Sequence, residues 1–222
     1  MERIVEKELM DDPKHAIAYA NADFEKINNR VIEIFDIEFP DTEIKGTILD
    51  LGCGPGDITF RFAKRFPDST VIGIDGAAIM IELANQRKCR ETEFLRNITF
   101  IEAEIPVAPI PGIPYDLIVS NSLYHHLHDP EVLWKTILDY GSSGTKIFIV
   151  DLFRPDSKER ADWLVNEYSG NEPEILKKDF YNSLCASFEP AEVEQQLSNI
   201  GLSGLSVKIV SDRHLVVYGE VE

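Results

Sequence analysis

The stretch ILDLGCGPGDITFRFAKRF, residues 48–66, places an apolar run, three glycines within five positions and a helical pattern in direct succession. The apolar run predicts a buried strand, and residues 58–66 predict a helix. Glycine loses conformational entropy wherever the chain is held in one conformation, and an ordinary strand–helix turn needs one glycine rather than three. Gly52, Gly54 and Gly56 therefore predict a loop that leaves bare backbone for a ligand.

The same alternation of strand and helix continues beyond this stretch. Short β-branched or apolar runs occupy residues 47–51, 70–75, 98–103, 115–121 and 146–153, and helical patterns occupy residues 58–66, 77–88 and 130–140. Continuous apolar strands separated by amphipathic helices indicate a parallel sheet that is covered on both faces. Right-handed crossovers then make this a doubly wound α/β sheet.

The flanking segments predict helices and a final strand pair. Residues 1–45 have a helical pattern, with a helix start at Asp12 and Pro13 and an end at Pro40. Residues 190–202 predict a helix that stops at Gly201, and residues 205–210 and 214–221 predict a hairpin. We therefore expect an N-terminal helical lid (1–45) and one domain (46–222) with a helical cap insertion at about 154–187.

Composition limits the partners and the compartment. The chain has 39 acidic and 22 basic residues, a formal net charge of -17, so its surface repels phosphate backbones and anionic lipid heads. This disfavours nucleic acid and membrane partners. Three widely spaced cysteines indicate neither a disulfide framework nor a zinc site, and we expect no metal and a reducing, cytoplasmic setting. Neither a secretory signal nor an apolar run of about 20 residues is visible in the sequence.

Acidic residues around the glycine loop indicate which ligand it suits. Asp75 ends the run at residues 70–75, where a carboxylate can accept hydrogen bonds from a ribose diol; the competing role, a helix N-cap, is compatible with this one. Asp57 occupies the place of the third glycine of a dinucleotide fingerprint and opposes an anionic pyrophosphate. Asp50, two residues before the loop, suits a cationic ligand portion. The loop thus favours a phosphate-free nucleoside with a cationic end.

The resemblance to a known family rests on four segments. LDLGCGPG (49–56), IGID (72–75), FIEAEI (100–105) and YDLIVSNSLYHHLHDP (115–130), with the final strand pair, resemble the class I S-adenosylmethionine-dependent methyltransferases. The motif similarity covers about residues 46–150, and the topological similarity extends to the end of the chain. It implies a seven-stranded, mostly parallel sheet of order 3-2-1-4-5-7-6 with the last strand antiparallel.

The resemblance also implies S-adenosylmethionine (SAM) as cofactor, S-adenosylhomocysteine (SAH) as product, and roles for individual residues. Asp50 and the glycine loop would face the methionine portion, Asp75 the ribose and Met80 the adenine. Glu104 stands where the family usually has Asp for the adenine amino group, which is a departure in side-chain length. The full set implied for the cofactor is Asp50, Gly52, Gly54, Gly56, Asp75, Gly76, Met80, Glu104, Ile105 and Asn121.

Residues for the second substrate are less specific. The segment HHLHDP (125–130) follows the predicted fourth strand, and His125 and His126 are candidate general bases, although such a pair can equally be structural. Tyr19 and Arg154 are candidate substrate contacts, Arg154 as an anion contact. Further aromatic residues that could line a pocket or form the core of the cap are Phe24, Trp163, Tyr168, Phe180 and Tyr181.

These features predict a methyltransferase that acts on a small organic molecule by in-line displacement. Alternatives that the sequence leaves open are a tRNA-modifying methyl- or carboxymethyl-transferase, a non-catalytic module that binds the cofactor, and a nicotinamide dehydrogenase. The motif NPPY or DPPY, expected of enzymes that methylate amines of DNA bases, is absent from the sequence. The acceptor and the oligomeric state, a homodimer among the options, are left open.

Overall fold

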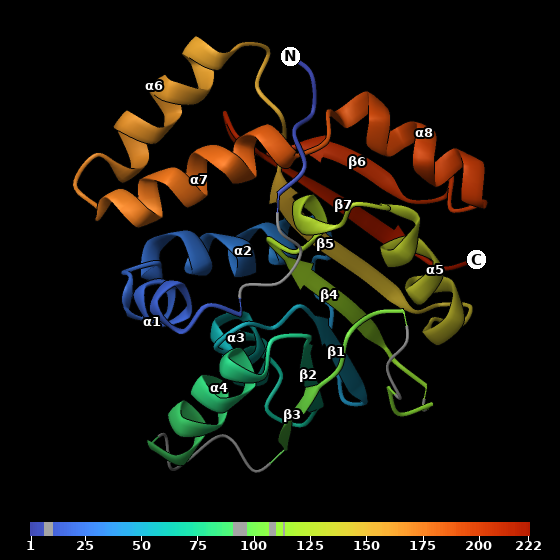
Figure 1. Ribbon diagram of the computed structural model, residues 1–222. Helices are drawn as coiled ribbons and strands as arrows, with labels where there is room; N and C mark the ends of the chain where they lie inside the picture. Colours follow the sequence, from blue (N-terminus) through green and yellow to red (C-terminus); the bar gives the residue numbers. More distant parts are fainter. Residues whose placement is uncertain (7–10, 91–96, 107–109, 113) are drawn as a thin grey trace.

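A seven-stranded sheet with helices on both faces forms the body of the molecule (Figure 1). We describe it from a computed structural model, which covers residues 1–6, 11–90, 97–106, 110–112 and 114–222. The strands are β1 (Thr47–Leu51), β2 (Thr70–Asp75), β3 (Ile98–Glu102), β4 (Leu117–Asn121), β5 (Lys146–Leu152), β6 (Ser206–Ile209) and β7 (His214–Glu220).

The strand order β3-β2-β1-β4-β5-β7-β6 confirms the predicted topology. The first five strands in the chain pair in parallel, whereas β7 is antiparallel to both β5 and β6. The order reverses beside β1, where the chain leaves toward β2 on one side and β4 on the other. Ligands of open α/β sheets bind at this switch point, outside the carboxyl ends of the strands.

Two layers of helices bury the sheet, because alternate side chains of each strand point to opposite faces. Ile48 of β1 packs with helices α2, α3 and α4, and the adjacent Leu49 packs with α5 and α8. The helices are α1 (Pro13–Asn21), α2 (Glu25–Glu38), α3 (Asp57–Arg65), α4 (Ala78–Arg90), α5 (Glu131–Tyr140), α6 (Lys158–Ser169), α7 (Glu174–Ala186) and α8 (Pro190–Ile200), with a short 3-10 turn η1 (Tyr124–His126).

The prediction that residues 1–45 are helical is wrong for residues 1–6. Helices α1 and α2 form, but residues 1–6 have no helical structure, and residues 7–10 lie outside the described part of the chain. The amide of Ile4 donates to the carbonyl of Cys185, and the Arg3 guanidinium donates to the carbonyls of Ala186 and Leu127. These tertiary hydrogen bonds hold the segment extended past the end of α7 (Figure 1). Residues 1–6 are called the N-terminal strap below.

Helices α1 and α2 lie between the α6–α7 pair and the α3–α4 pair (Figure 1). Helix α1 contacts both α4 and α7, and α2 contacts α3. The segment expected to be helical, at about residues 154–187, contains α6 and α7, which pack on each other through Ala161, Leu164 and Leu184. Its role as a cap stays a prediction. The lid function of residues 1–45 stays a prediction. None of the described helices is both long and apolar enough to cross a bilayer.

Candidate active site

A cavity of about 490 Å³ opens at the carboxyl ends of the parallel strands. It is lined by the loops that follow β1, β2, β3 and β4 and by parts of α1, α2 and α7. Its lining includes twelve of the residues singled out from the sequence, namely Tyr19, Asp50, Gly52, Gly54, Asp75, Gly76, Met80, Glu104, Ile105, Asn121, His125 and His126. Residues from distant parts of the chain therefore share one cavity, in a size range typical of small-molecule sites.

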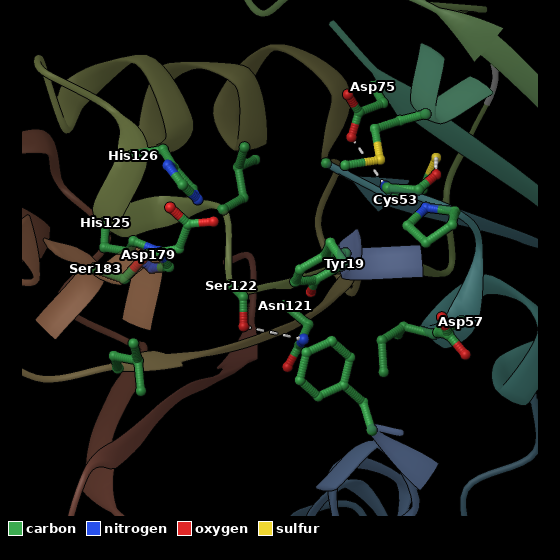
Figure 2. Close-up of a pocket in the computed structure, with 18 of the residues that line it drawn as sticks. Tyr19, Cys53, Asp57, Asp75, Asn121, Ser122, His125, His126, Asp179 and Ser183 are labelled. Carbon is green, nitrogen blue, oxygen red and sulfur yellow. Dashed lines mark hydrogen bonds between the residues drawn. The ribbon is translucent and has the colours of Figure 1, made fainter. Parts of the chain in front are cut away.

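The cavity has two chemically different ends (Figure 2). Asp75 and Cys53 lie on one side, His125 and His126 on the other, and Asn121 lies between them. We call the part formed by Asp50, Gly52, Gly54 and Asp75 the glycine end. The part formed by His125, His126, Asp179 and Ser183 is the histidine end.

All three glycines of the loop after β1 have positive φ angles, 70° at Gly52, 52° at Gly54 and 88° at Gly56. Residues with a Cβ atom are strained in this region. A Cβ at Gly52 would lie 2.8 Å from Leu123, whereas one at Gly54 would meet nothing within 4 Å. The loop therefore needs glycine for its path at all three positions, and Gly54 also presents open backbone to the cavity.

Gly56, which the resemblance implies as a cofactor contact, lies outside the described lining of the cavity. It is not among the described residues that line the cavity, and it precedes the first residue of α3. A Cβ there would lie 2.8 Å from the ring of Phe100, so the third glycine permits close packing between α3 and β3. The structure thus supports a packing role for Gly56, and its contact with the cofactor stays a prediction.

Asp75, at the end of β2, holds the loop and faces the cavity. Its two carboxylate oxygens accept hydrogen bonds from the amides of Gly54 (2.9 Å) and Ala77 (2.8 Å). Burial raises the pKa of this carboxyl, and the two amide donors partly offset the rise. Each oxygen has a second lone pair, so the carboxylate can still accept from a ligand diol.

Asp50, near the end of β1, is a buried carboxyl that forms no ion pair with an arginine or lysine of the described part of the chain. Its side chain accepts from the Thr59 hydroxyl at 2.5 Å. Burial raises its pKa to about 7, the Thr59 hydrogen bond opposes the rise and nearby Asp75 adds to it. A cationic ligand group near Asp50 would stabilise the carboxylate, so this end of the cavity favours a positive charge.

Asp57 does not act as the uncompensated charge that the sequence suggests. Its carboxylate pairs with Arg61 at 3.3 Å and with Arg87 of α4 at 2.7 Å. Arg87 lies 30 positions away in the sequence, so the pairing is a tertiary contact. The preference against a phosphate therefore rests on Asp50 and Asp75 and not on Asp57.

Tyr19 of α1 and Met80 of α4 close the cavity on the helical side. Tyr19 packs against Phe24 with ring centroids 5.0 Å apart, and burial raises its pKa to about 12. Met80 is buried and packs with Ala16 and Ala77. Phe24, Tyr168 and Phe180 also line the cavity. Of the other aromatic candidates, Trp163 is 46% exposed and Tyr181 packs on the α6–α7 core, and the lining includes neither.

At the histidine end, His125 is fixed by a buried carboxylate. Its Nδ1 lies 2.5 Å from Asp151 at the end of β5, and Asp151 also accepts from the amides of Tyr124 and Leu152. Burial lowers the pKa of His125, but the carboxylates of Asp151 and Glu6 outweigh this, so the pKa lies above its usual value. Asp151 shows the reverse balance, because His125 and the amides outweigh burial and lower its pKa.

Sequence reasoning missed Asp151 and Glu6. Asp151 ends an apolar strand without any motif, and Glu6 is one acidic residue in a charged N-terminal stretch. The N-terminal strap brings Glu6 Oε1 to 3.7 Å from His125 Nε2 and 3.3 Å from His126 Nδ1. Contacts over more than a hundred residues leave no local sequence signal, so only the folded chain shows this cluster.

Arg154 requires a correction. The side chain is buried, and its guanidinium pairs with Glu189 at 3.0 Å and Glu192 at 2.9 Å. It also donates to the carbonyl of Ser187. Arg154 is not among the described lining residues, because these partners hold it at the start of α8, so it does not serve as the expected substrate contact.

Comparisons with known proteins agree with this geometry. The family model described as "Methyltransferase domain" matches residues 43–200. An uncharacterized methyltransferase of Schizosaccharomyces pombe is 29% identical over 134 residues, which are 54% of this chain and 47% of that protein. Trans-aconitate 2-methyltransferase of Yersinia pestis is 40% identical over 91 residues, 41% of this chain and 32% of that protein. The match thus spans about a third to a half of these relatives.

Solved structures show the same fold. The plantazolicin methyltransferase BpumL in complex with SAH has a TM-score of 0.70 and 22% identity, covering 95% of this chain and 91% of that one. A SAM-dependent methyltransferase from Aquifex aeolicus has a TM-score of 0.67 and 17% identity, covering 93% and 97%. With its glycine loop, its strand order and the family match over residues 43–200, the chain belongs to the methyltransferase-domain family, the class I SAM-dependent methyltransferases.

Proposed function

We propose that this protein transfers a methyl group from SAM to a small organic acceptor and releases SAH. The observation that carries this proposal is one cavity with two ends, an acidic glycine end built on bare backbone and a histidine end. A nucleoside with a cationic methionine portion suits the first end, which leaves the second end for the acceptor. The acidic net charge of -17 supports an acceptor other than nucleic acid.

We assign the cofactor contacts by position in the lining. Asp75 accepts from the ribose hydroxyls, Asp50 stabilises the cationic methionine portion directly or through water, and Met80 packs on adenine. Glu104 and Ile105 follow β3 beside the adenine, and Asn121 approaches the methionine portion from the end of β4. These roles fit the lone pairs, burial and chain positions of the residues.

The acceptor site has an apolar wall and few cations. Phe24, Leu176 and Phe180 contribute apolar surface. Arg213 is the only arginine or lysine among the described lining residues, and its guanidinium donates to Asp212 at 3.0 Å. The relative named for trans-aconitate acts on a polyanion, and this lining lacks the cation cluster that such an acceptor would require. We therefore propose an acceptor with an apolar body and a single nucleophilic oxygen or nitrogen.

In the reaction, a lone pair of the acceptor attacks the methyl carbon in line with the bond to sulfur. The carbon–sulfur bond breaks, its electron pair stays on sulfur, and neutral SAH leaves. The protein supplies mainly alignment of the two reactants. A hydroxyl or protonated amine must also lose a proton, and we propose that an imidazole nitrogen of His125 or His126 accepts it.

Equilibrium dialysis against SAM and against NAD, followed by SAH release with a panel of small amines, phenols and carboxylic acids, tests the proposal. We expect binding of SAM and not NAD, and SAH formation with at least one small acceptor. Binding of NAD alone would contradict the cofactor assignment. SAH formation with total tRNA only, or SAM binding without turnover on any acceptor, would favour the tRNA-modifying or the regulatory alternative.

A further inference from the structure

Three metal-ligating side chains converge at the histidine end of the cavity. They are Glu6 of the N-terminal strap and the adjacent His125 and His126 of η1 (Figure 2 shows the two histidines). Their ligand atoms all lie within 4.8 Å of one another. Glu6 Oε1 is 3.7 Å from His125 Nε2 and 3.3 Å from His126 Nδ1. None of the three belongs to the glycine end.

These separations suit a common ion. Zinc binds histidine nitrogen and carboxylate oxygen at about 2.0 to 2.2 Å in tetrahedral geometry, which places neighbouring ligand atoms about 3.4 Å apart. The two measured separations, 3.3 Å and 3.7 Å, lie on either side of that value. The third separation, between the two histidine nitrogens, is within 4.8 Å, so the histidine side chains would move toward each other when an ion binds.

Asp151 gives His125 the arrangement of a metal ligand. Its carboxylate binds Nδ1 at 2.5 Å and is itself held by the amides of Tyr124 and Leu152. With Nδ1 donating to Asp151, Nε2 carries the free lone pair of the ring and lies 3.7 Å from Glu6 Oε1. Histidines that bind metals almost always donate their other nitrogen to a carboxylate, carbonyl or water in this way.

Proton sharing accounts less well for this geometry. If His125 were an imidazolium that bridged the two carboxylates, both of its nitrogens would make hydrogen bonds. The distance of 3.7 Å between Nε2 and Glu6 Oε1 exceeds a hydrogen bond. An ion between Nε2, Oε1 and His126 Nδ1 balances the buried carboxylate charge without that bond.

The strap holds Glu6 in this position. Arg3 donates to the carbonyls of His125, Leu127 and Ala186, and its guanidinium stacks over Phe188 with 3.8 Å to the ring centroid. The Glu6 carboxylate also accepts from the Ser183 hydroxyl at 3.0 Å. The third ligand is therefore fixed to both η1 and α7.

We propose that Glu6, His125 and His126 bind a divalent transition-metal ion of the zinc class, with Asp151 as the residue that positions His125. Two histidines and one carboxylate leave coordination positions open, as in catalytic sites. This role rests on the proposed function: the open positions would receive the oxygen or nitrogen of the acceptor and lower its pKa. With the ion bound, the proton of the acceptor would leave to solvent rather than to a histidine. The proposed site revises the expectation, drawn from the sequence, that the protein has no metal site.

Titration of chelator-treated protein with Co²⁺, followed by visible absorption, tests the site without any assay of activity. We expect saturation at one equivalent, displacement by Zn²⁺ and a higher Tm with Zn²⁺. Glu6→Gln and His126→Ala should each weaken Co²⁺ binding at least tenfold, and Asp151→Asn by about 10- to 100-fold. Glu2→Gln, an exposed carboxylate of the same strap, is the matched control and should bind Co²⁺ as the unaltered protein does.

Two results would overturn the proposal. One is the absence of both a Co²⁺ spectrum and a Zn²⁺-dependent rise in Tm in the unaltered protein. The other is unchanged Co²⁺ affinity in both Glu6→Gln and His126→Ala, with circular dichroism showing that the variants are folded. SAH affinity measured on the same samples keeps the two proposals separate, because normal SAH binding without Co²⁺ binding refutes only the metal site.

Discussion

The glycine end and the histidine end of the cavity are built in different ways. The glycine end comes from continuous strand–loop–helix segments, so Asp50, Gly52 and Gly54 are neighbours in the sequence and in space. The histidine end combines the strap, the turn after β4 and the end of β5, and Glu6 meets His125 across 119 positions of the chain. One end is a local motif, and the other is an assembly of distant segments.

Because of this difference, we expect amino-acid substitutions to affect the two ends in different ways. A loop with a required backbone path loses function when one residue is altered, because its neighbours cannot replace the lost geometry. An assembled site depends on packing far from the ligand, so Arg3 can matter although it only holds the strap. Four predictions test this contrast, from the largest expected effect to the smallest.

Asp75→Ala should reduce SAH affinity by at least about 100-fold, because the substitution removes the proposed ribose acceptor and leaves the amides of Gly54 and Ala77 without their partner. Isothermal titration calorimetry with SAH measures the effect. The control is Asp68→Ala, because Asp68 is exposed and lies shortly before the first residue of β2, far along the strand from Asp75. This variant should bind SAH as the unaltered protein does. Unaltered SAH affinity in Asp75→Ala would refute the ribose assignment.

Gly52→Ala and Gly54→Ala should separate stability from binding. At Gly52 the new Cβ has a strained φ and clashes with Leu123, so we expect a loss of about 3 kcal/mol in the free energy of unfolding. At Gly54 only the strain applies, about 1 kcal/mol, but the methyl group enters the open space and should weaken SAH binding at least tenfold. Urea unfolding and calorimetry measure the two effects; equal losses of stability would contradict this contrast.

SAH affinity should rise about tenfold from pH 6 to pH 8. In the free protein burial raises the pKa of Asp50 to about 7, so the carboxyl is mostly protonated at pH 6. SAH lacks the sulfonium charge of SAM but keeps the ammonium group of its amino-acid portion, and this cation favours the carboxylate, so binding releases a proton and strengthens as pH rises. Calorimetry in buffers of different ionisation enthalpy measures this proton release. Asp50→Asn should abolish the pH dependence, and a flat profile in the unaltered protein would contradict the assignment.

Arg3→Ala should change SAH affinity by less than about twofold, because the contacts given above for Arg3 lie at the ends of η1 and α7 and not at the glycine end. The free energy of unfolding should fall by about 1 to 2 kcal/mol. Hydrogen exchange at the Ile4 amide, which donates to Cys185, should become faster. The matched control is Arg30→Ala, which breaks an exposed ion pair with Glu33. It should change neither the free energy of unfolding nor the exchange rate of the Ile4 amide. A large loss of SAH binding in Arg3→Ala would show that the two ends are coupled.

Periodicity and glycine placement predicted the strands and most helices, because apolar spacing reflects burial on the two faces of the sheet. The bounds of β1 and β2 agree with the predicted runs at residues 47–51 and 70–75. The extended strap was not predictable, since its hydrogen bonds run to Cys185 and Ala186 at the end of α7. Arg154 was misassigned for the same reason, because a position beyond a strand does not show that Glu189 and Glu192 neutralise it.

The sequence alone determined the alternation of strands and helices and the glycine loop with Asp50 and Asp75, because these depend on short-range patterns of burial and backbone conformation. The strand order was expected from the resemblance to a known family and not from those patterns. The tertiary structure decided which charges remain available to a ligand. It paired Asp57 with Arg61 and Arg87, and it brought Glu6, His125 and Asp151 together. Electrostatic and coordination partners act over a few ångströms of space whatever their separation in the chain, so no local pattern records them.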